Sequence, residues 1–301
     1  MLSPFQQHRR PAAHPTSRVA PPLVGGTQGA QLALGLLSRR APALHSDLME
    51  ALSGGQLRLH YQGQFDLRTG GLVALEALIR WAHPREGLLA PARFLPMAQD
   101  AGLMSAIDRW ALQTACADGA WLAQRGHPVE IAVNVSAAQL TDRSFPASVH
   151  DVADRAGCAT ELLTLEIGQK DVLLDLDTAS AVALELGILG IRTSISEVGA
   201  ASTSDRDVQV LHADEIKIDR RLTAGVGAGP GETDDVVRGV VAAARQLRAR
   251  VVIEGVETEA QYRFAREVGC DRAQGYLLER PAALEDLAHL LARRQPAPPS
   301  R

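Results

Sequence analysis

From Asp47 onward, short runs rich in aliphatic and β-branched residues alternate along the chain with stretches that have the periodicity of amphipathic helices. Alternation of this kind builds a parallel sheet covered by helices, and eight such runs favour a closed barrel over an open sheet. The sequence therefore predicts an α/β fold, a TIM-like (β/α)8 barrel. The expected strands are Leu57–Phe65, Leu72–Arg80, Glu130–Ser136, Leu162–Ile167, Ile191–Ser196, Glu215–Asp219, Arg250–Glu254 and Arg272–Leu277. The clearest helical patterns are Ser105–Gln124, Val172–Leu189, Asp234–Arg248, Glu259–Val268 and Leu284–Arg293.

The connection between the first two runs departs from the regular barrel pattern. Only a short turn at Thr69, Gly70 and Gly71 separates them, whereas a parallel crossover needs a dozen or more residues. The first strand is therefore predicted to pair antiparallel with the second.

The two ends of the chain differ in composition from the barrel. Residues 1–45 are rich in Pro, Ala and Arg and contain no Asp or Glu, which is typical of a disordered basic tail. Residues 294–301 are a second predicted disordered tail, so the domain is expected to span residues 46–293. A basic tail suits an anionic partner, but an inert extension is the more common case, and we assign the tail no function.

Overall charge and cysteine content exclude several classes of protein. A formal net charge of -4 gives no basic field for binding a nucleic-acid backbone. The 3 cysteines are far apart and outside any CxxC spacing, so neither a disulfide framework nor a zinc site is predicted, and a cytoplasmic location fits best. The longest apolar run near the N-terminus, Leu32–Leu37, is too short for a membrane span or a signal peptide.

Polar residues stand at the ends of six of the predicted strands. In a barrel these ends converge on one face, where active sites are found. Carboxylate and amide oxygens there are the ligands that Mg²⁺ or Mn²⁺ prefers, and a neighbouring lysine and further acids are suited to orienting a water against a phosphate. The residues are Glu76, Asn134, Glu166, Lys217, Asp219, Glu254 and Gln274. The pattern predicts a phosphodiester-type site.

At this point the sequence resembles the EAL domain family of cyclic di-GMP phosphodiesterases. The likeness covers about residues 46–293 and consists of ordered motifs: Tyr61-Gln62, Glu76-Ala77-Leu78 with Ile79-Arg80-Trp81, Phe94-Leu95-Pro96, Val133-Asn134-Val135-Ser136, Leu165-Glu166-Ile167, Lys217-Ile218-Asp219, Glu254-Gly255-Val256-Glu257 and Gln274-Gly275-Tyr276-Leu277. The resemblance implies the EAL form of the barrel and a soluble bacterial signalling protein that uses magnesium or manganese.

The resemblance also implies roles for individual residues. Glu76, Asn134 and Glu166 would hold a first metal, Glu254 would serve a second, and Lys217 with Asp219 would position the attacking water, supported by Gln274. The residues that would bind the nucleotide are Gln62, Arg80, Asp108, Glu257 and Pro281. Arg80 has the forked guanidinium that suits phosphate oxygens, although a simple ion pair at the barrel rim is the alternative.

The family pattern is broken around one loop. Where the family has DDFGTGYSS, this chain has Ser196-Glu197-Val198-Gly199-Ala200-Ala201-Ser202-Thr203-Ser204. The resemblance implies that the first aspartate bridges two metals, and the hydroxyl of Ser196 replaces neither its charge nor its oxygens. Glu197 keeps a carboxylate on a longer side chain and is retained as a candidate metal ligand. Gln169 replaces the acid of the family's LEITES motif.

Two functions therefore remain open. The first is a degenerate receptor or interaction module that binds cyclic di-GMP with hydrolysis lost or much reduced, and with one metal at most. The second is an active phosphodiesterase that yields the linear dinucleotide pGpG and holds two metals. A protein partner or a homodimer is compatible with either. A different metal-dependent barrel enzyme is a third reading that no motif supports.

Overall fold

The computed structural model describes residues 47–172, 175–199, 213–227 and 231–292. The predicted tails at 1–45 and 294–301 lie outside these ranges. None of the helices in the described part of the chain combines the length and the apolar character that a bilayer crossing requires.

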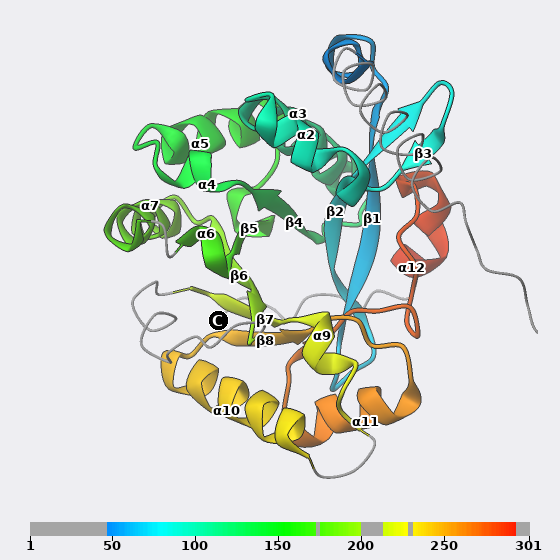
Figure 1. Cartoon of the computed structure of the whole chain (residues 1–301), viewed down its shortest axis with the longest axis vertical. Helices are drawn as coiled ribbons and strands as arrows, with labels where there is room; N and C mark the ends of the chain where they lie inside the picture. Colours follow the sequence, from blue (N-terminus) through cyan, green and yellow to red (C-terminus); the bar gives the residue numbers. More distant parts are fainter. Residues whose placement is uncertain (1–46, 173–174, 200–212, 228–230, 293–301) are drawn as a thin grey trace, which may run out of the picture. The chain divides into compact units, whose positions relative to one another are not determined.

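Eight strands close into a barrel, as the alternating pattern predicted (Figure 1). The strand order is β1-β9-β8-β7-β6-β5-β4-β2, and a further pairing of β1 with β2 closes the ring. β1 runs antiparallel to both β2 and β9, while the strands from β2 through β4 to β9 are mutually parallel in the ring. The strands are β1 Leu57–Asp66, β2 Leu72–His83, β3 Gly87–Leu89, β4 Glu130–Val135, β5 Leu163–Gly168, β6 Arg192–Val198, β7 Glu215–Ile218, β8 Arg250–Ile253 and β9 Arg272–Ala273.

Helices follow the parallel strands and cover the outside of the barrel. In Figure 1, α3, α5 and α7 lie on one side of the ring, and α10 and α11 cover β7 and β8 on another. The helices are α2 Leu95–Asp100, α3 Met104–Gln124, α4 Ala137–Leu140, α5 Phe145–Ala156, α6 Gln169–Val172, α7 Leu176–Ile188, α9 Arg220–Thr223, α10 Glu232–Leu247, α11 Glu259–Val268 and α12 Ala288–Ala292, with helical residues 47–53 before β1. Short 3-10 turns are η1 Pro91–Arg93, η2 Thr160–Leu162 and η3 Leu284–Leu287.

Local sequence signals explain where the helices begin and end. In α11, Thr258 and Gln261 form a reciprocal capping box, and Gly269 ends the helix in the left-handed conformation. In α10, three acids in the first turn suit the positive end of the helix dipole. These signals place α11 directly after the loop that carries Glu254.

Charged residues fill the amino-terminal end of the barrel interior. Glu130 and Glu215, which open β4 and β7, are buried and contact Arg250 and Arg272, which open β8 and β9. Arg272 Nη1 lies 3.1 Å from Glu130 Oε1 and 3.3 Å from Glu215 Oε2. Each buried charge therefore has an opposite partner, which is the condition for tolerating charge in a core.

Some predicted boundaries were wrong. The run at Arg272–Leu277 is a strand only over Arg272–Ala273, because its remaining residues bend across the end of the barrel. β6 extends beyond Ser196 to Val198 through a bulge. The helix expected at Val172–Leu189 occupies Leu176–Ile188, and a separate turn, α6, precedes it. The helix expected at Leu284–Arg293 divides into η3 and α12, and β3, α2 and α5 had no prediction.

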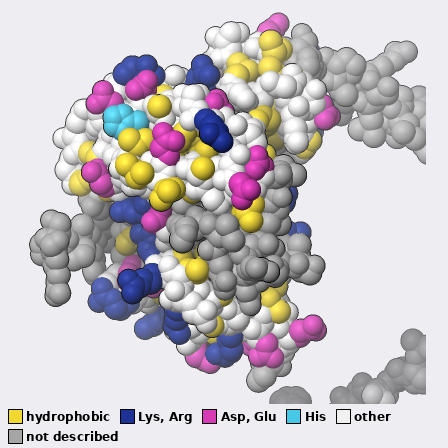
Figure 2. All heavy atoms as spheres, turned by 90° about the vertical axis from the view of Figure 1, so that its left-hand side faces the viewer, with side chains coloured by type: hydrophobic (Ala, Val, Ile, Leu, Met, Phe, Trp, Pro, Cys, Tyr) yellow, Lys and Arg dark blue, Asp and Glu magenta, His cyan; other side chains and the backbone are white. Residues whose placement is uncertain are grey.

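Exposed hydrophobic side chains occur on the outer helices. Leu184 and Ile188 on α7 are 64% and 78% exposed. Figure 2 faces the side of the molecule that carries α5 and α7, and its hydrophobic side chains lie among acidic ones instead of merging into one continuous patch.

Candidate active site

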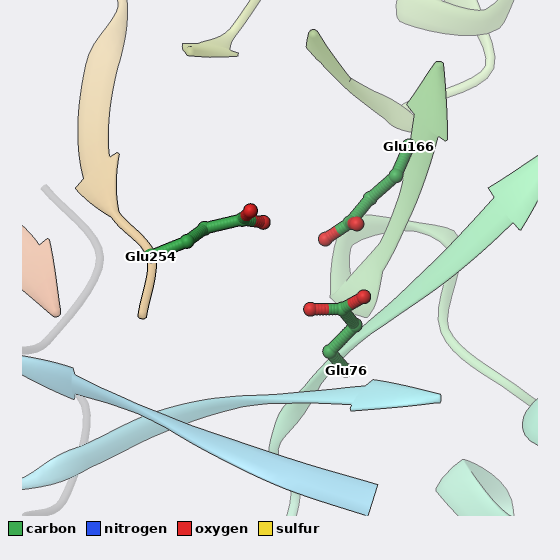
Figure 3. A group of neighbouring side chains, drawn as sticks. All are labelled: Glu76, Glu166 and Glu254. Atoms are coloured by element: carbon green, nitrogen blue, oxygen red, sulfur yellow. The ribbon is translucent and has the colours of Figure 1, made fainter. Parts of the chain in front are cut away.

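Three glutamates meet at the carboxyl end of the barrel. Glu76 lies on β2, Glu166 on β5, and Glu254 directly after β8. One carboxylate oxygen from each lies within 4.8 Å of the others, and Figure 3 shows the three side chains pointing toward one another. The strand-end pattern in the sequence therefore brings these residues together.

The ammonium of Lys217 sits among these carboxylates. It lies 2.8 Å from Glu76 Oε2, 2.8 Å from Glu166 Oε1 and 2.7 Å from Glu254 Oε1, and its side chain is fully buried on β7. The group therefore contains three acids and one base. We define these four residues as the acidic centre.

Two amide side chains extend the acidic centre. Asn134 on β4 is exposed and donates a 3.3 Å hydrogen bond to Glu76 Oε1. Gln274, after β9, donates from Nε2 to Glu76 Oε2 at 2.7 Å and to Gln62 Oε1 at 3.0 Å. Gln62 in turn donates to the carbonyl of Glu279 at 2.9 Å. The network thus joins the predicted metal ligands to a predicted nucleotide-binding residue.

Burial and mutual charge set the protonation of the acidic centre. Burial opposes ionisation of Glu76, but Lys217 and the hydrogen bonds to its carboxylate keep its pKa below the usual value. Burial, followed by the charge of Glu76, raises the pKa of Glu166 well above its usual value, and burial also raises the pKa of Glu254. Burial would lower the pKa of Lys217, but the three carboxylates raise it well above normal. The surrounding carboxylates therefore favour the charged form of Lys217.

The residues present fit a divalent cation. The three carboxylates are hard oxygen ligands of the kind that Mg²⁺ and Mn²⁺ prefer. Gln274 Oε1 belongs to a side chain that is only 4% exposed and has no hydrogen-bond partner among the described residues. Because a buried acceptor without a partner is costly, this oxygen points to a missing donor or cation.

The departures from the family pattern lie at the ends of β5 and β6. Ser196 is buried, and its hydroxyl donates a 3.4 Å hydrogen bond to the carbonyl of Ile167. Glu197 has a φ of 63°, a left-handed conformation that is uncommon for a residue with a side chain. Its side chain is 48% exposed, with Oε2 3.8 Å from Nζ of Lys170. Gln169 is buried, and its Nε2 has no partner among the described residues.

Asp219 follows β7 but bonds away from the acidic centre. Its Oδ1 accepts from the backbone N–H of Arg221 at 2.6 Å, and its Oδ2 accepts from Nη2 of the same residue at 2.8 Å. These hydrogen bonds hold its pKa below the usual value despite partial burial. Within the described part of the chain, the hydrogen bonds of Lys217 go to the three glutamates and none goes to Asp219.

Arg80 and Asp108 line the same end of the barrel. Arg80 is half-buried on β2 and donates to the carbonyl of Ile79 at 2.8 Å. Among the described residues no carboxylate lies within 4.0 Å of its guanidinium, although the charge of Glu76 acts on Arg80 from further away. Burial raises the pKa of Asp108 to about 6, although the hydroxyl and N–H of Ser136 both donate to its Oδ2.

The remaining predicted nucleotide-binding residues lie on two loops. Glu257 is exposed in the loop between Glu254 and α11, and its backbone N–H donates to Gln261. Pro281 is half-buried next to Ala282, which pairs with Tyr61 of β1.

Three residues near this site were not predicted. His60 stands two positions before Gln62 on β1, so both side chains share a strand face. Burial, followed by the charge of Arg80, lowers the pKa of His60. Tyr276 and Arg280 lie on the segment after Gln274. The two-residue period of the first strand could have placed His60 on the same face as Gln62. The positions of Tyr276 and Arg280 depend on the bend after β9, which the sequence does not show.

The fold and the acidic centre define a barrel protein whose acidic site lies at the carboxyl ends of the strands. The EAL domain pattern matches residues 45–281, and the chain belongs to this family.

Relatives and solved structures agree with this assignment. The chain is 36% identical over 244 residues to a protein of Pseudomonas aeruginosa described as the bifunctional diguanylate cyclase/cyclic di-GMP phosphodiesterase MucR, covering 80% of this chain and 35% of that protein. It is 37% identical to an uncharacterized protein of Mycobacterium bovis over 83% of this chain and 40% of that protein. The chain thus spans about two fifths or less of the length of these relatives. The MucR phosphodiesterase in complex with c-di-GMP superimposes with a TM-score of 0.77 at 36% identity, covering 81% of this chain and 99% of that one.

Proposed function

We propose that this chain is a degenerate EAL domain that binds cyclic di-GMP at the carboxyl end of its barrel and hydrolyses it slowly or not at all. The observation that carries the proposal is the separation of Glu197 from the acidic centre. Glu76, Glu166 and Glu254 converge, while the carboxylate of Glu197 points toward Lys170 and the neighbouring position is the neutral Ser196.

The binding half of the proposal rests on residues outside the altered loop. Gln62 is held by Gln274 and the carbonyl of Glu279, and the guanidinium of Arg80 has no carboxylate partner among the described residues. A half-buried arginine with no carboxylate in direct contact is suited to a bidentate contact with phosphate oxygens. The structure of MucR superimposed above contains c-di-GMP, which supports the choice of ligand.

The catalytic half rests on the number of acids that converge. A divalent cation held by Glu76, Glu166 and Glu254 would neutralise phosphate charge and activate a water. Lys217 already supplies one positive charge to the same carboxylates, and its ammonium orients them. A single site of this kind is sufficient to hold a phosphate, but hydrolysis with two metals needs a further bridging acid.

A specific observation favours the alternative, an active phosphodiesterase. The acidic centre retains three carboxylates and Lys217 in mutual contact, and Gln274 Oε1 is left without a partner among the described residues. If Glu197 turns inward on cation binding, slow conversion to pGpG follows.

The proposal predicts binding without rapid turnover. With excess Mn²⁺, the full chain is expected to bind cyclic di-GMP in calorimetry and to form linear product at least ~100-fold more slowly than the MucR phosphodiesterase domain, the scale expected from a displaced catalytic ligand. Arg80→Ala should weaken binding. Rapid turnover by the parent protein in a chromatographic assay would refute the catalytic half, and no detectable binding would refute the receptor half.

A restoration experiment separates the two halves. The triple variant Ser196→Asp, Glu197→Asp and Gln169→Glu is expected to gain turnover with little change in affinity, because these positions lie at the ends of β5 and β6, away from Gln62 and Arg80 on β1 and β2. The matched control is Glu185→Asp on the exposed face of α7. Equal turnover in all three proteins would show that the altered loop does not limit hydrolysis.

The number of metal sites is a separate prediction. Calorimetric titration with Mn²⁺ is expected to show one tight site at most, and Glu166→Gln should abolish it because that carboxylate is one of the three that converge. Two tight sites in the parent protein would contradict this.

A further inference from the structure

The segment from Gln274 to Ala282 crosses the carboxyl end of the barrel from β9 to β1. At its start, Gln274 reaches the acidic centre. Further along, the carbonyl of Glu279 accepts from Gln62, and the backbone of Ala282 exchanges two hydrogen bonds with Tyr61, at 2.7 and 3.1 Å. We call this segment the crossing segment.

Close backbone contact fixes the middle of the crossing segment. A Cβ on Gly275 would lie 2.2 Å from both the N and the O of Val256, so only glycine fits there. The N–H of Leu277 donates to the Val256 carbonyl at 3.0 Å, and the N–H of Val256 donates to the Gln274 carbonyl at 3.0 Å. The backbone on both sides of Tyr276 is therefore held against the loop that follows β8.

This fixed backbone presents an exposed aromatic ring beside two arginines. Tyr276 is 50% exposed, and Cζ of Arg280 lies 4.3 Å from the centroid of its ring, within the range of a cation–π contact. Arg80 is also within range of the ring: burial lowers the pKa of Arg80, and the interactions with Tyr276 and Glu76 oppose that shift. Tyr276 therefore lies near Arg80 as well.

We propose that Tyr276, held by Arg280, is a stacking shelf for one purine base of the bound cyclic dinucleotide. This inference rests on the proposed function, because it places the ligand in the same site. Because the backbone at Tyr276 is already held in place, a base that stacks on its ring needs little further ordering of the chain, and a neighbouring guanidinium adds attraction to both base and phosphate. Arg80 then contacts a phosphate while the base stacks on the ring of Tyr276.

The chain contains a matched pair away from this site. Cζ of Arg125 lies 3.9 Å from the centroid of the Trp121 ring, and Trp121 is 44% exposed. The pair lies at the end of α3, just before β4 begins, so it belongs to the amino-terminal end of the barrel. If loss of any exposed aromatic ring beside an arginine weakened ligand binding, substitutions of Trp121 and of Tyr276 would weaken it equally.

The test is calorimetric binding of cyclic di-GMP to the full chain at a fixed salt concentration. Tyr276→Leu, which keeps bulk but removes the ring, and Tyr276→Ala are expected to raise the Kd about 5- to 100-fold, the range for loss of one stacked base. Tyr276→Phe should stay within about twofold of the parent, because the ring persists. Arg280→Gln should weaken binding, and Trp121→Ala should leave it unchanged.

The outcomes distinguish the shelf from the proposed function. If the parent binds, Arg80→Ala weakens binding, and Tyr276→Leu binds as the parent does with an unchanged melting temperature, the shelf is refuted and the proposed function stands. If the parent shows no binding, both fail. If Trp121→Ala weakens binding as much as Tyr276→Ala, the effect is not specific to the shelf, and the inference is overturned.

Discussion

Lys217 is the residue on which the carboxyl end of this barrel most depends. Its ammonium contacts Glu76, Glu166 and Glu254, and both Lys217 and Glu166 are almost fully buried. Three carboxylates so close together would repel one another without a cation. The lysine therefore has a structural task, in addition to any part in binding a phosphate or a water.

This task predicts a large effect of removing the charge. Lys217→Met is expected to lower the free energy of unfolding by about 3–5 kcal/mol, as for other buried ion pairs that lose one partner, and the melting temperature by roughly 10 °C. Lys170→Met is the matched control, because Lys170 is the only other lysine in the chain and its side chain is 74% exposed. Mn²⁺ should raise the melting temperature of Lys217→Met more than that of the parent, because the cation replaces the lost charge.

Calorimetric or fluorescence melting checks this prediction. An unchanged melting temperature in Lys217→Met would mean that the glutamates relieve their repulsion by taking up protons at little cost.

Strand elements were the part of the fold most readily predicted from sequence. The strands β5, β7 and β8 are short, mostly apolar runs, and the polar residue of each that faces the site stands near the end of the strand or directly after it. α5 was missed because its sequence mixes Pro, Ser, His and Asp with a few apolar residues. β3 was missed because three residues carry no periodic signal.

The sequence predicted which residues belong to the candidate site, but it predicted only some of the contacts between them. The strand-end rule identified the residues that meet in the acidic centre, such as Glu76 and Lys217. The same rule placed Asp219 beside them, and its charge does act on Glu254, but its carboxylate accepts hydrogen bonds from Arg221. The orientation of Glu197 depends on the bulge between Ile195 and Val198 and on a positive φ, and sequence periodicity does not report torsion angles.

The loop that carries Glu254 is held in place by the start of α11. The side chain of Thr258 accepts from the N–H of Gln261, and Gln261 accepts from the N–H groups of Glu257 and Thr258 and donates to the carbonyl of Thr223. Thr258→Ala is expected to cost about 1 kcal/mol of stability through loss of the N-cap. Gln261→Ala should cost more, because it removes all the hydrogen bonds of a buried side chain.

Chemical denaturation of both variants tests this element. Thr178→Ala, near the start of α7, is a comparison variant that keeps the backbone N–H of the capping bond to Asp175. Equal stability of Thr258→Ala and the parent protein would contradict a stabilising role for the capping box.

Across the whole barrel, the two ends differ in the balance of charge. The carboxyl end has three glutamates around one lysine. The amino-terminal end pairs its buried glutamates with several arginines, and these interactions hold the network together across β4, β7, β8 and β9. The surplus of acids suits the carboxyl end to cations, while the buried charges of the amino-terminal end have partners of opposite sign.

The amino-terminal network makes acid stability depend on Glu130. Burial opposes its ionisation, but Arg272, Arg250 and Arg192 lower its pKa to about 2 from a usual value of 4.5. Because the folded-state pKa is depressed, the stabilisation is fully present above pH 4.5 and is lost as the pH falls toward 2. The difference corresponds to about 3 kcal/mol. Glu130→Gln should therefore be less stable than the parent at pH 7, with the gap closing between pH 4.5 and 2, whereas Glu185→Gln on the surface of α7 should follow the parent throughout. Melting curves recorded over this pH range provide the measurement, and a gap that stays constant with pH would show that the ionisation of Glu130 does not hold the end of the barrel together.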